Sequence, residues 1–167
     1  MHEADVDVKI GVITVSTSRY EKYGDVRLED LENVDDESGK TIVKAFKDST
    51  VAYKLVPDDT KMILKAVLEM EADVVILTGG TGLNPRDVTV EALEGIFDKK
   101  IEGFGEVFRY ESLKEIGYNA ILSRATAGVV NGKVVFALPG SKKAVELGVK
   151  IIKDILKHVV THAKGLK

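Results

Sequence analysis

Three apolar runs of strand length, spaced along the first half of the chain, constrain the fold more than any other feature. They cover residues 9–16 (KIGVITVS), 51–56 (VAYKLV) and 72–78 (ADVVILT), and each is rich in β-branched residues. β-Branched side chains favour strands, and a strand that is apolar on both faces lies inside a sheet covered on both sides. The sequence therefore predicts buried strands of a parallel sheet.

The segments between these runs carry the spacing of amphipathic helices. One predicted helix begins behind Ser38, which we expect to act as its N-cap. Another opens at Asp58 and Asp59 and repeats its apolar residues at intervals of three and four up to Met70. Residues 17–37 are polar and charged, so they are predicted to form a loop.

The second half of the chain continues the alternation and adds a hairpin. Helices are predicted over residues 89–97 and 103–116, and a last helix over residues 141–161. Residues 127–138 read as two short strands about an Asn-Gly dipeptide, which suits a type I′ turn. Alternating strands and helices yield a mostly parallel sheet covered on both faces. We predict one three-layer α/β/α domain over residues 1–167, with a short β-hairpin added to its central sheet.

Composition excludes several chemistries. The chain has no cysteine, so it cannot use a disulfide, a thiol nucleophile or a Cys-ligated metal centre. Its 24 basic and 27 acidic residues leave a formal net charge of -3 without a block of like charges, which favours neither nucleic acid nor a membrane as a partner. No apolar stretch approaches the about 18 residues of a membrane span, and the start, MHEADVDVK, lacks the pattern of a secretory signal. We expect a cytoplasmic protein.

One turn in the chain suits an anion. The segment LTGGTGLNPRD, residues 77–87, follows the third apolar run and contains Gly79, Gly80 and Gly82. Glycines let the backbone bend sharply and bring several N–H groups close to one ligand. In parallel sheets, ligands bind beyond the carboxyl ends of the strands, which is where this turn is expected. It is a candidate phosphate site.

Two familiar phosphate motifs do not account for this chain. The sequence SGKT at residues 38–41 matches the end of a P-loop, but Val34 occupies the position of the first glycine, and residues 35–37 would place three negative charges beside the phosphates. A dinucleotide-binding fingerprint that starts at Gly80 would require a glycine where Pro85 stands. We reject both motifs.

Two aspartates follow strand ends near the turn. Asp87 could supply a hard oxygen ligand to a magnesium ion that bridges phosphates, and Asp58 is placed to be a second carboxylate. Ser141 would open another helix N-terminus at the same edge. The alternative is structural: the glycines close a tight turn, Asp58 and Asp59 cap one helix, and Asp87 caps the next. Spacing alone leaves both interpretations open.

Four segments carry a resemblance to a known family. LTGGTGLNPRDVTVEAL at residues 77–93, IEGFGEVFR at 101–109, AILSRATAGV at 120–129 and ALPGSKKA at 137–144 are similar, in the same order, to the MoaB/MogA family of molybdenum cofactor biosynthesis. That family has the molybdopterin-binding fold, shared with one domain of gephyrin and of plant Cnx proteins. The second and third segments look more like the MoaB branch than like MogA.

The resemblance implies adenylylation of molybdopterin, in which the pterin's terminal phosphate attacks the α-phosphorus of ATP and pyrophosphate leaves. It implies Asp58 and Asp87 as catalytic residues that hold Mg²⁺ and organise ATP. The residues that it implies for contacts with phosphates are Thr78, Gly79, Gly80, Thr81, Gly82, Pro139, Gly140 and Ser141. The residues that it implies around the pterin are Ser112 and Ser123, with Glu106 and Arg109 in the motif between the loops.

Several alternatives accompany these assignments. Arg109 could be a surface salt-bridge partner, Ser112 and Ser123 could cap or face solvent, and Glu106 could serve helix electrostatics. The protein could be a molybdopterin-binding carrier without catalysis, or a CinA-like relative that acts on another nucleotide. The resemblance also implies a homo-oligomer, a trimer or a hexamer, and a downstream metal-insertion protein as a possible partner.

Overall fold

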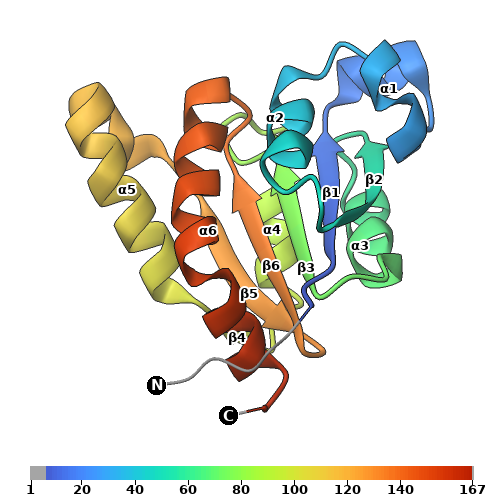
Figure 1. Ribbon diagram of the computed structural model, residues 1–167. Coiled ribbons are helices and arrows are strands. Elements are labelled where there is room, and N and C mark those ends of the chain that lie inside the picture. Colours follow the sequence, from blue (N-terminus) through green and yellow to red (C-terminus); the bar gives the residue numbers. More distant parts are fainter. Residues whose placement is uncertain (1–6, 167) are drawn as a thin grey trace.

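A six-stranded sheet forms the middle layer of the computed structural model (Figure 1). The structure describes residues 7–166, so residues 1–6 and 167 of the predicted domain lie outside the described part. In chain order the elements are β1 (Ile10–Val15), α1 (Thr17–Tyr23), the 3-10 helix η1 (Leu28–Asn33), α2 (Glu37–Ala45), β2 (Thr50–Val56), α3 (Thr60–Glu69), β3 (Val74–Thr78), α4 (Thr89–Glu94), β4 (Lys99–Lys100), α5 (Glu102–Ile116), the 3-10 helix η2 (Gly117–Leu122), β5 (Thr126–Val130), β6 (Lys133–Leu138) and α6 (Lys142–Ala163).

The strand order is β2-β1-β3-β6-β5-β4. Strands β2, β1, β3 and β6 are parallel, whereas β5 and β4 pair antiparallel at one edge. The register pairs Thr14 of β1 with Thr78 of β3, and Thr78 with Leu138 of β6. The carboxyl ends of these strands therefore lie side by side. The predicted mostly parallel sheet with an added hairpin is confirmed.

The sheet has a hydrophobic cluster on each face. From β1, Ile10 and Val12 enter the cluster under α2, α5 and α6, while Ile13 and Val15 enter the one under α3 and α4. Both isoleucines are fully buried, and burial of such a side chain contributes about 1.5–3 kcal/mol. The strand reads as a continuous apolar run because both of its faces are covered. The three-layer arrangement in Figure 1 confirms the predicted fold class.

The prediction of a loop over residues 17–37 is wrong, because this segment contains α1 and η1. Ser16 caps α1 by accepting a hydrogen bond from the N–H of Arg19 at 3.3 Å. Helix α1 buries no residue, and η1 buries only Leu31. A helix without an apolar stripe has no periodicity to detect, which explains the error.

The predicted cap of α2 is also wrong, because Asp36 and not Ser38 is the N-cap. The Asp36 carboxylate accepts hydrogen bonds from the N–H of Gly39 at 3.0 Å, from Thr14 Oγ1 at 2.6 Å and from the Tyr53 hydroxyl at 2.6 Å. It is 1 % exposed, and a buried carboxylate requires such donors. Ser38 lies inside the first turn of the helix.

The hairpin and the segment before it differ in how well they were predicted. The Asn-Gly turn has positive φ at both positions, 50° and 78°, which is the backbone of a type I′ turn and confirms that prediction. Helix α4 ends at Glu94 rather than at residue 97, because the chain turns to pair with β5 and Asp98 donates its N–H to the Val129 carbonyl at 2.8 Å. The two-residue strand β4 that follows was not predicted.

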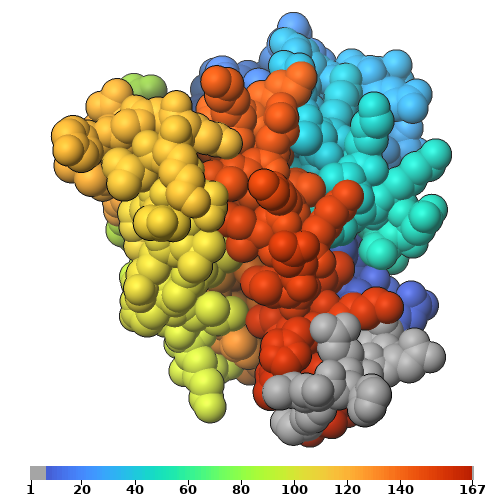
Figure 2. Space-filling view, turned by 60° about the vertical axis from the view of Figure 1, so that its left-hand side comes forward, coloured from blue at the N-terminus to red at the C-terminus, as the bar shows by residue number. Residues whose placement is uncertain are grey.

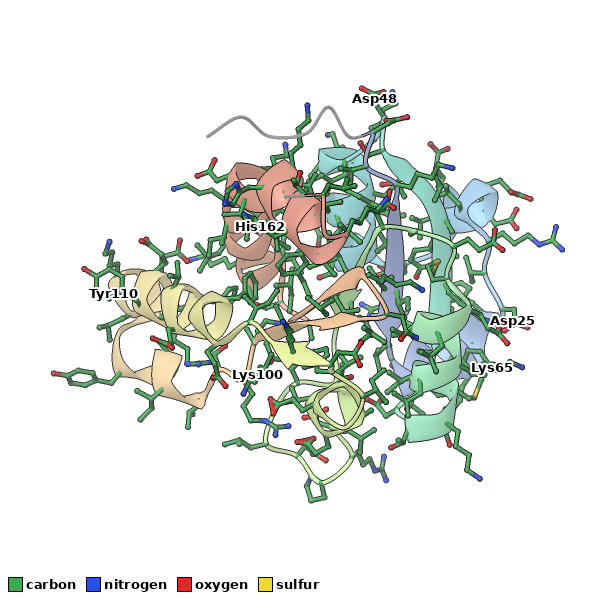
Figure 3. The ribbon with its side chains drawn as sticks, turned by 90° about the horizontal axis from the view of Figure 1, so that it is seen from below. Asp25, Asp48, Lys65, Lys100, Tyr110 and His162 are labelled. Carbon is green, nitrogen blue, oxygen red and sulfur yellow. The ribbon has the colours of Figure 1, made fainter. Side chains whose placement is uncertain are left out.

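Helix α5 and η2 form an arm at one side of the molecule, which Figures 1 and 2 show in yellow and gold beside α6. Gly117, with a φ of 68°, ends α5 and starts η2. Tyr110 lies at the outer side of this arm in Figure 3. The exposed apolar residues of the α5–η2 arm are Val107, Tyr110, Leu113, Ile116, Tyr118, Ile121 and Leu122. Even so, none of the helices within residues 7–166 combines the length and the apolar character needed to cross a bilayer.

Candidate functional site

Two turns meet where the parallel strands end. The first, called here the glycine loop (residues 79–88), follows β3, and the second, the PGS turn (residues 139–141), follows β6. Thr78 Oγ1 donates a hydrogen bond to the Pro139 carbonyl at 3.0 Å. The N–H of Gly79 donates to the last carbonyl of β6 at 3.0 Å. These contacts hold the two predicted phosphate loops against each other.

The first two glycines of the loop are required by its geometry. Gly79 and Gly80 have φ of 99° and 69°, in the region that L side chains rarely adopt. A Cβ on Gly79 would lie 2.3 Å from the Val15 carbonyl oxygen, and one on Gly80 would lie 2.3 Å from Thr89 Oγ1. Thr89 also holds both glycines, because its Oγ1 donates to the Gly79 carbonyl and its N–H to the Gly80 carbonyl, each at 3.0 Å.

The loop leaves several N–H groups for a ligand. Within residues 7–166, the N–H groups of Gly80, Thr81 and Gly82 donate no hydrogen bond. The PGS turn leads into α6, whose N-cap Ser141 accepts from the N–H of Ala144 at 3.3 Å. Unpaired backbone N–H groups in a concave turn, beside a helix N-terminus, are the arrangement that binds anions such as phosphate.

Asp58 faces the glycine loop. Its Oδ2 accepts hydrogen bonds from Thr17 Oγ1 at 2.8 Å and from the Thr17 N–H at 3.3 Å, which orient the carboxylate. Its Oδ1 lies 3.1 Å from the position that a Cβ on Gly80 would occupy. Asp59 is the residue that caps α3, by accepting from the N–H of Met62 at 2.9 Å. The capping alternative is therefore correct for Asp59 and wrong for Asp58.

Asp87 approaches the same loop from its other end. Its Oδ2 lies 2.6 Å from the position that a Cβ on Gly82 would occupy. The N-cap of α4 is Val88, which makes no side-chain capping bond, so Asp87 does not cap that helix. Both carboxylates therefore lie against glycines of this loop, and their role in binding a metal stays a prediction.

The donor set fits magnesium bound together with a phosphate ligand. Mg²⁺ prefers oxygen ligands and is commonly held by one or two carboxylates, with substrate phosphates and water completing its shell. Asp58 and Asp87 provide such carboxylates, while no group of three or more His, Asp or Glu side chains within residues 7–166 could hold a metal by itself. The residues present could therefore hold a cation that arrives with a nucleotide.

Two cavities open on either side of one ion pair, formed by Arg124 and Glu91. A cavity of about 300 Å³ is bordered by the glycine loop and includes Asp87 in its lining. A second cavity, of about 420 Å³, lies between α4, α5 and β5. Lys100, labelled in Figure 3, lines this second cavity. The Arg124–Glu91 pair lines both of them.

The second cavity contains two of the residues predicted for the pterin side, Arg109 and Ser123. Arg109 Nη1 donates to the carbonyls of Ala125 at 3.2 Å and Ser123 at 3.4 Å. A Cβ on Gly105 would lie 2.7 Å from Arg109 Nη2, so glycine at that position makes room for the guanidinium. Arg109 thus packs against backbone carbonyls and is not a surface salt-bridge partner among the described residues.

A buried hydroxyl in the second cavity has no partner. Thr126, on β5, is 3 % exposed, and its Oγ1 makes no hydrogen bond with any residue from 7 to 166. Buried polar groups normally have a partner, so an orphan hydroxyl in a cavity wall indicates a place for a ligand atom or a water molecule. No motif in the sequence predicts a role for this residue.

Two of the residues predicted for the pterin side are not brought to either cavity. Glu106 lies on the exposed side of α5, and Ser112 is buried at 7 % exposure further along the same helix. Neither is among the described residues that line the two cavities. Their assignment to the pterin side stays a prediction from the resemblance.

Three further residues of the site were not predicted: Thr17, Glu91 and Arg124. Thr17 lies in a segment that was predicted as loop, and its partner Asp58 is 41 positions away. Arg124 and Glu91 are 33 positions apart, and neither belongs to a pattern of fixed spacing. Contacts at such separations are formed by the fold and have no local sequence signal.

Comparisons with known proteins show which family this chain resembles. The family described as "Probable molybdopterin binding domain" matches residues 11–158. The Molybdopterin adenylyltransferase of Pyrococcus furiosus is 42% identical over 174 residues, which cover 97% of this chain and 95% of that protein. The Probable molybdopterin adenylyltransferase of Methanocaldococcus jannaschii is 40% identical over 169 residues, which cover 98% and 99%.

The fold agrees with a solved structure as well. The crystal structure of the tungsten cofactor synthesizing protein MoaB from Pyrococcus furiosus matches with a TM-score of 0.82 and 43% sequence identity, over 94% of this chain and 97% of that one. The glycine loop, the PGS turn and the facing aspartates thus stand in a chain that resembles these relatives from end to end. The chain belongs to the MoaB/MogA family of molybdopterin-binding, molybdenum cofactor biosynthesis proteins.

Proposed function

We propose that this protein is a molybdopterin adenylyltransferase, which transfers the adenylyl group of ATP to the terminal phosphate of molybdopterin. The observation that carries the proposal is the position of Asp58 and Asp87, whose carboxylates face the glycine loop at Gly80 and Gly82. The names of the relatives from Pyrococcus furiosus and Methanocaldococcus jannaschii support it. The cytoplasm is the compartment that we propose for the reaction.

The reaction needs no covalent group from the protein. An oxygen of the pterin's terminal phosphate attacks the α-phosphorus of ATP and forms a new P–O bond. The bond from the α-phosphorus to the oxygen that bridges to the β-phosphate breaks, and its electron pair leaves with pyrophosphate. Such transfers are accelerated by positioning and by neutralisation of charge, so the absence of cysteine is no obstacle.

Asp58 and Asp87 would hold Mg²⁺ together with the phosphates of ATP. When bound, the metal supplies positive charge to the phosphate oxygens. Thr17 keeps the Asp58 carboxylate oriented through its hydrogen bonds of 2.8 and 3.3 Å. The unpaired N–H groups of the glycine loop, together with the PGS turn, supply donors for phosphate oxygens.

The cavity of about 420 Å³ is the place that we propose for the pterin. Its volume lies within the about 300–1,000 Å³ that is usual for small-molecule sites. The hydroxyl of Thr126 and the side chain of Ser123 would meet polar atoms of the ligand, and Arg109 adds positive charge. Because Arg124 and Glu91 line both cavities, the two proposed substrate sites would adjoin each other.

We also propose a homo-oligomer, a trimer or a hexamer, assembled through the exposed apolar residues of the α5–η2 arm. A contiguous apolar surface on a chain in water is commonly covered by another subunit. Tyr118 is 86% exposed and Ile121 is 74% exposed on this arm. Tyr118→Glu should reduce the mass measured by light scattering, while Leu68→Glu, on the exposed face of α3, should leave it unchanged. An unchanged mass for Tyr118→Glu would count against the arm as the interface.

A single-turnover incubation with molybdopterin and Mg-ATP tests the proposed activity. Formation of adenylyl-molybdopterin and pyrophosphate by the native protein is the expected result, since the cavity beside Asp87 and the cavity proposed for the pterin share the Arg124–Glu91 pair in their walls. Tight molybdopterin binding without product would instead identify a carrier. The product is a form ready for metal insertion, so a downstream metal-insertion protein is the partner that we propose to consume it.

A further inference from the structure

Arg124 holds the glycine loop by its backbone. This arginine precedes β5, and its Nε donates to the Thr81 carbonyl at 3.1 Å while its Nη2 donates to the Gly82 carbonyl at 2.7 Å. The same guanidinium forms an ion pair with Glu91 of α4, in which Nη1 and Nη2 contact different carboxylate oxygens. One side chain thus joins β5, the glycine loop and α4.

The ion pair keeps this guanidinium in place. The hydrogen bonds that Arg124 donates to the Glu91 carboxylate raise the pKa of Arg124 and lower the pKa of Glu91. The side chains are 29% and 53% exposed, so the pair contributes little to global stability. Its geometry is the informative feature: a planar fork of five N–H donors can serve two carbonyls and a carboxylate at once, which a lysine ammonium cannot.

The contact to Gly82 reaches the proposed metal ligand. Asp87 Oδ2 lies 2.6 Å from the position of a Cβ on Gly82, so the carboxylate packs directly on that glycine. Arg124 holds the Gly82 carbonyl and thereby fixes the orientation of this peptide. The Asp87 carboxylate packs on the same glycine, so its position depends on that orientation. Arg124 and Glu91 also border both cavities, the one beside Asp87 and the one beside Thr126.

We propose that Arg124 is a positioning residue for adenylyl transfer, which acts by fixing the glycine loop under Asp87, and that Glu91 acts by fixing Arg124. The inference rests on the proposed function, because it concerns the same site. It assigns to Arg124 no contact with the reacting atoms. Loss of the guanidinium should release the loop, so that Asp87 and the phosphate-binding N–H groups are no longer held together.

The test compares Arg124→Lys and Arg124→Ala with the same changes at Arg27, an exposed arginine whose ion pair with Glu29 spans 3.8 Å. The single-turnover rate at saturating substrates should fall by about a hundredfold in both Arg124 variants, as expected for misplaced reacting groups. Affinity for Mg-ATP, measured by calorimetry, should fall by a larger factor than affinity for molybdopterin, whose proposed cavity Arg124 also lines. The Arg27 variants should match the native protein in all three measurements.

Two further measurements separate positioning from a loss of folding. Amide hydrogen exchange over residues 79–88 should speed up in the Arg124 variants, while exchange in β1 and β3 stays slow. Guanidinium ion at millimolar concentration should restore part of the rate of Arg124→Ala and none of the rate of Arg124→Lys, whose side chain fills the space. If Arg124→Ala unfolds globally, the test depends on Arg124→Lys, because lysine retains the positive charge and the aliphatic part of the side chain.

The outcomes are distinguishable from failure of the proposed function. If the native protein gives no adenylyl-molybdopterin, the proposed activity is wrong. The affinity for Mg-ATP and the hydrogen exchange of the glycine loop still test the role of Arg124 in that case. Native loop exchange and native Mg-ATP affinity in Arg124→Lys would overturn the inference. A greater loss of affinity for molybdopterin than for Mg-ATP would also overturn it, because a positioning role at the glycine loop acts mainly on the nucleotide side.

Discussion

Ser38 Oγ donates a hydrogen bond of 2.7 Å to the carbonyl of Gly140, and this contact joins segments that are 102 positions apart. Ser38 lies in the first turn of α2, directly beyond the buried cap Asp36, and Gly140 is the middle residue of the PGS turn. The segment SGKT, which resembles the end of a P-loop, therefore contacts the PGS turn in this fold, and we propose that this turn binds phosphate. The hydrogen bond connects the core beneath α2 to the candidate site.

We expect Ser38→Ala to loosen the PGS turn without unfolding the protein. Loss of one exposed hydrogen bond should lower the free energy of unfolding by at most about 0.5–1.5 kcal/mol. The KM for ATP should rise more than the KM for molybdopterin, because the PGS turn is proposed to contact nucleotide phosphates. Thr41→Ala is the matched control, since Thr41 Oγ1 donates to Glu37 of its own helix at 2.8 Å. Equal kinetic effects in both variants would argue against a link between Ser38 and the site.

Stability should decline in alkaline solution because of Tyr53. Burial, followed by its hydrogen bond to Asp36, raises the pKa of Tyr53 far above the ordinary value of 10.0. The unfolded chain loses the phenolic proton above pH about 10 while the folded chain keeps it, so the free energy of unfolding should fall by about 1.4 kcal/mol per pH unit from this group. Below that pH the contribution is fully present.

Urea unfolding of the native protein and Tyr53→Phe, followed from pH 9 to about pH 11, measures this effect. The native protein should lose stability with pH more steeply than Tyr53→Phe, which has no proton to release. Tyr118→Phe is the control, because Tyr118 is 86% exposed. This variant should lose stability with pH as steeply as the native protein. Parallel slopes for the native protein and Tyr53→Phe would show that Tyr53 titrates normally.

A methyl group on Gly82 should damage the site and spare the fold. The Cβ of Gly82→Ala would lie 2.6 Å from Asp87 Oδ2, so the carboxylate must move. A shift of about 1 Å in a reacting group can reduce a rate by about a hundredfold. Gly103→Ala is the control, because nothing lies within 4 Å of its Cβ on the exposed side of α5, and alanine there should stabilise the helix by about 0.5–1 kcal/mol. Turnover by the Gly82→Ala protein at the native rate would contradict the assigned role of Asp87.

The fold was predictable where burial imposes a period on the sequence. Strands β1 and β3 are buried at every position, and their sequences are therefore apolar runs. Asn131 and the glycine after it indicate the turn of the hairpin. Helix α1 was not predictable, because it buries no residue and therefore shows no apolar stripe. The two-residue strand β4 is likewise too short for periodicity, and only its pairing with β5 defines it.

The site was predictable only in part, for a related reason. Asp58 and Asp87 follow strands whose ends a parallel sheet brings together, so topology alone placed them near the glycine loop. Arg124 and Thr17 act through contacts with residues far along the chain, and no local spacing marks them. The buried hydroxyl of Thr126 is informative only because the fold leaves it without a partner within residues 7–166.

Adjacent aspartates give the sharpest test of the proposed chemistry. Asp58 and Asp59 are neighbours in sequence, yet Asp58 faces Gly80 of the glycine loop whereas Asp59 caps α3. Asp58→Asn keeps an oxygen that can accept from Thr17 but removes the negative charge, so binding of Mg²⁺ should weaken. Because metal charge stabilisation of a transferring phosphoryl group is worth several kcal/mol, single-turnover formation of adenylyl-molybdopterin should fall by about a hundredfold or more.

Asp59→Asn should behave differently although it is one position away. Asparagine is itself a good N-cap, so helix α3 and the turnover rate should both stay close to native. Asp87→Asn should lose turnover as Asp58→Asn does. Molybdopterin binding should be retained, because the Asp87 carboxylate packs on Gly82 and does not line the cavity beside Thr126. If Asp58→Asn and Asp59→Asn lost equal activity, the cause would be the α3 N-terminus that they share, and the carboxylate of Asp58 would have no separate role in binding the metal.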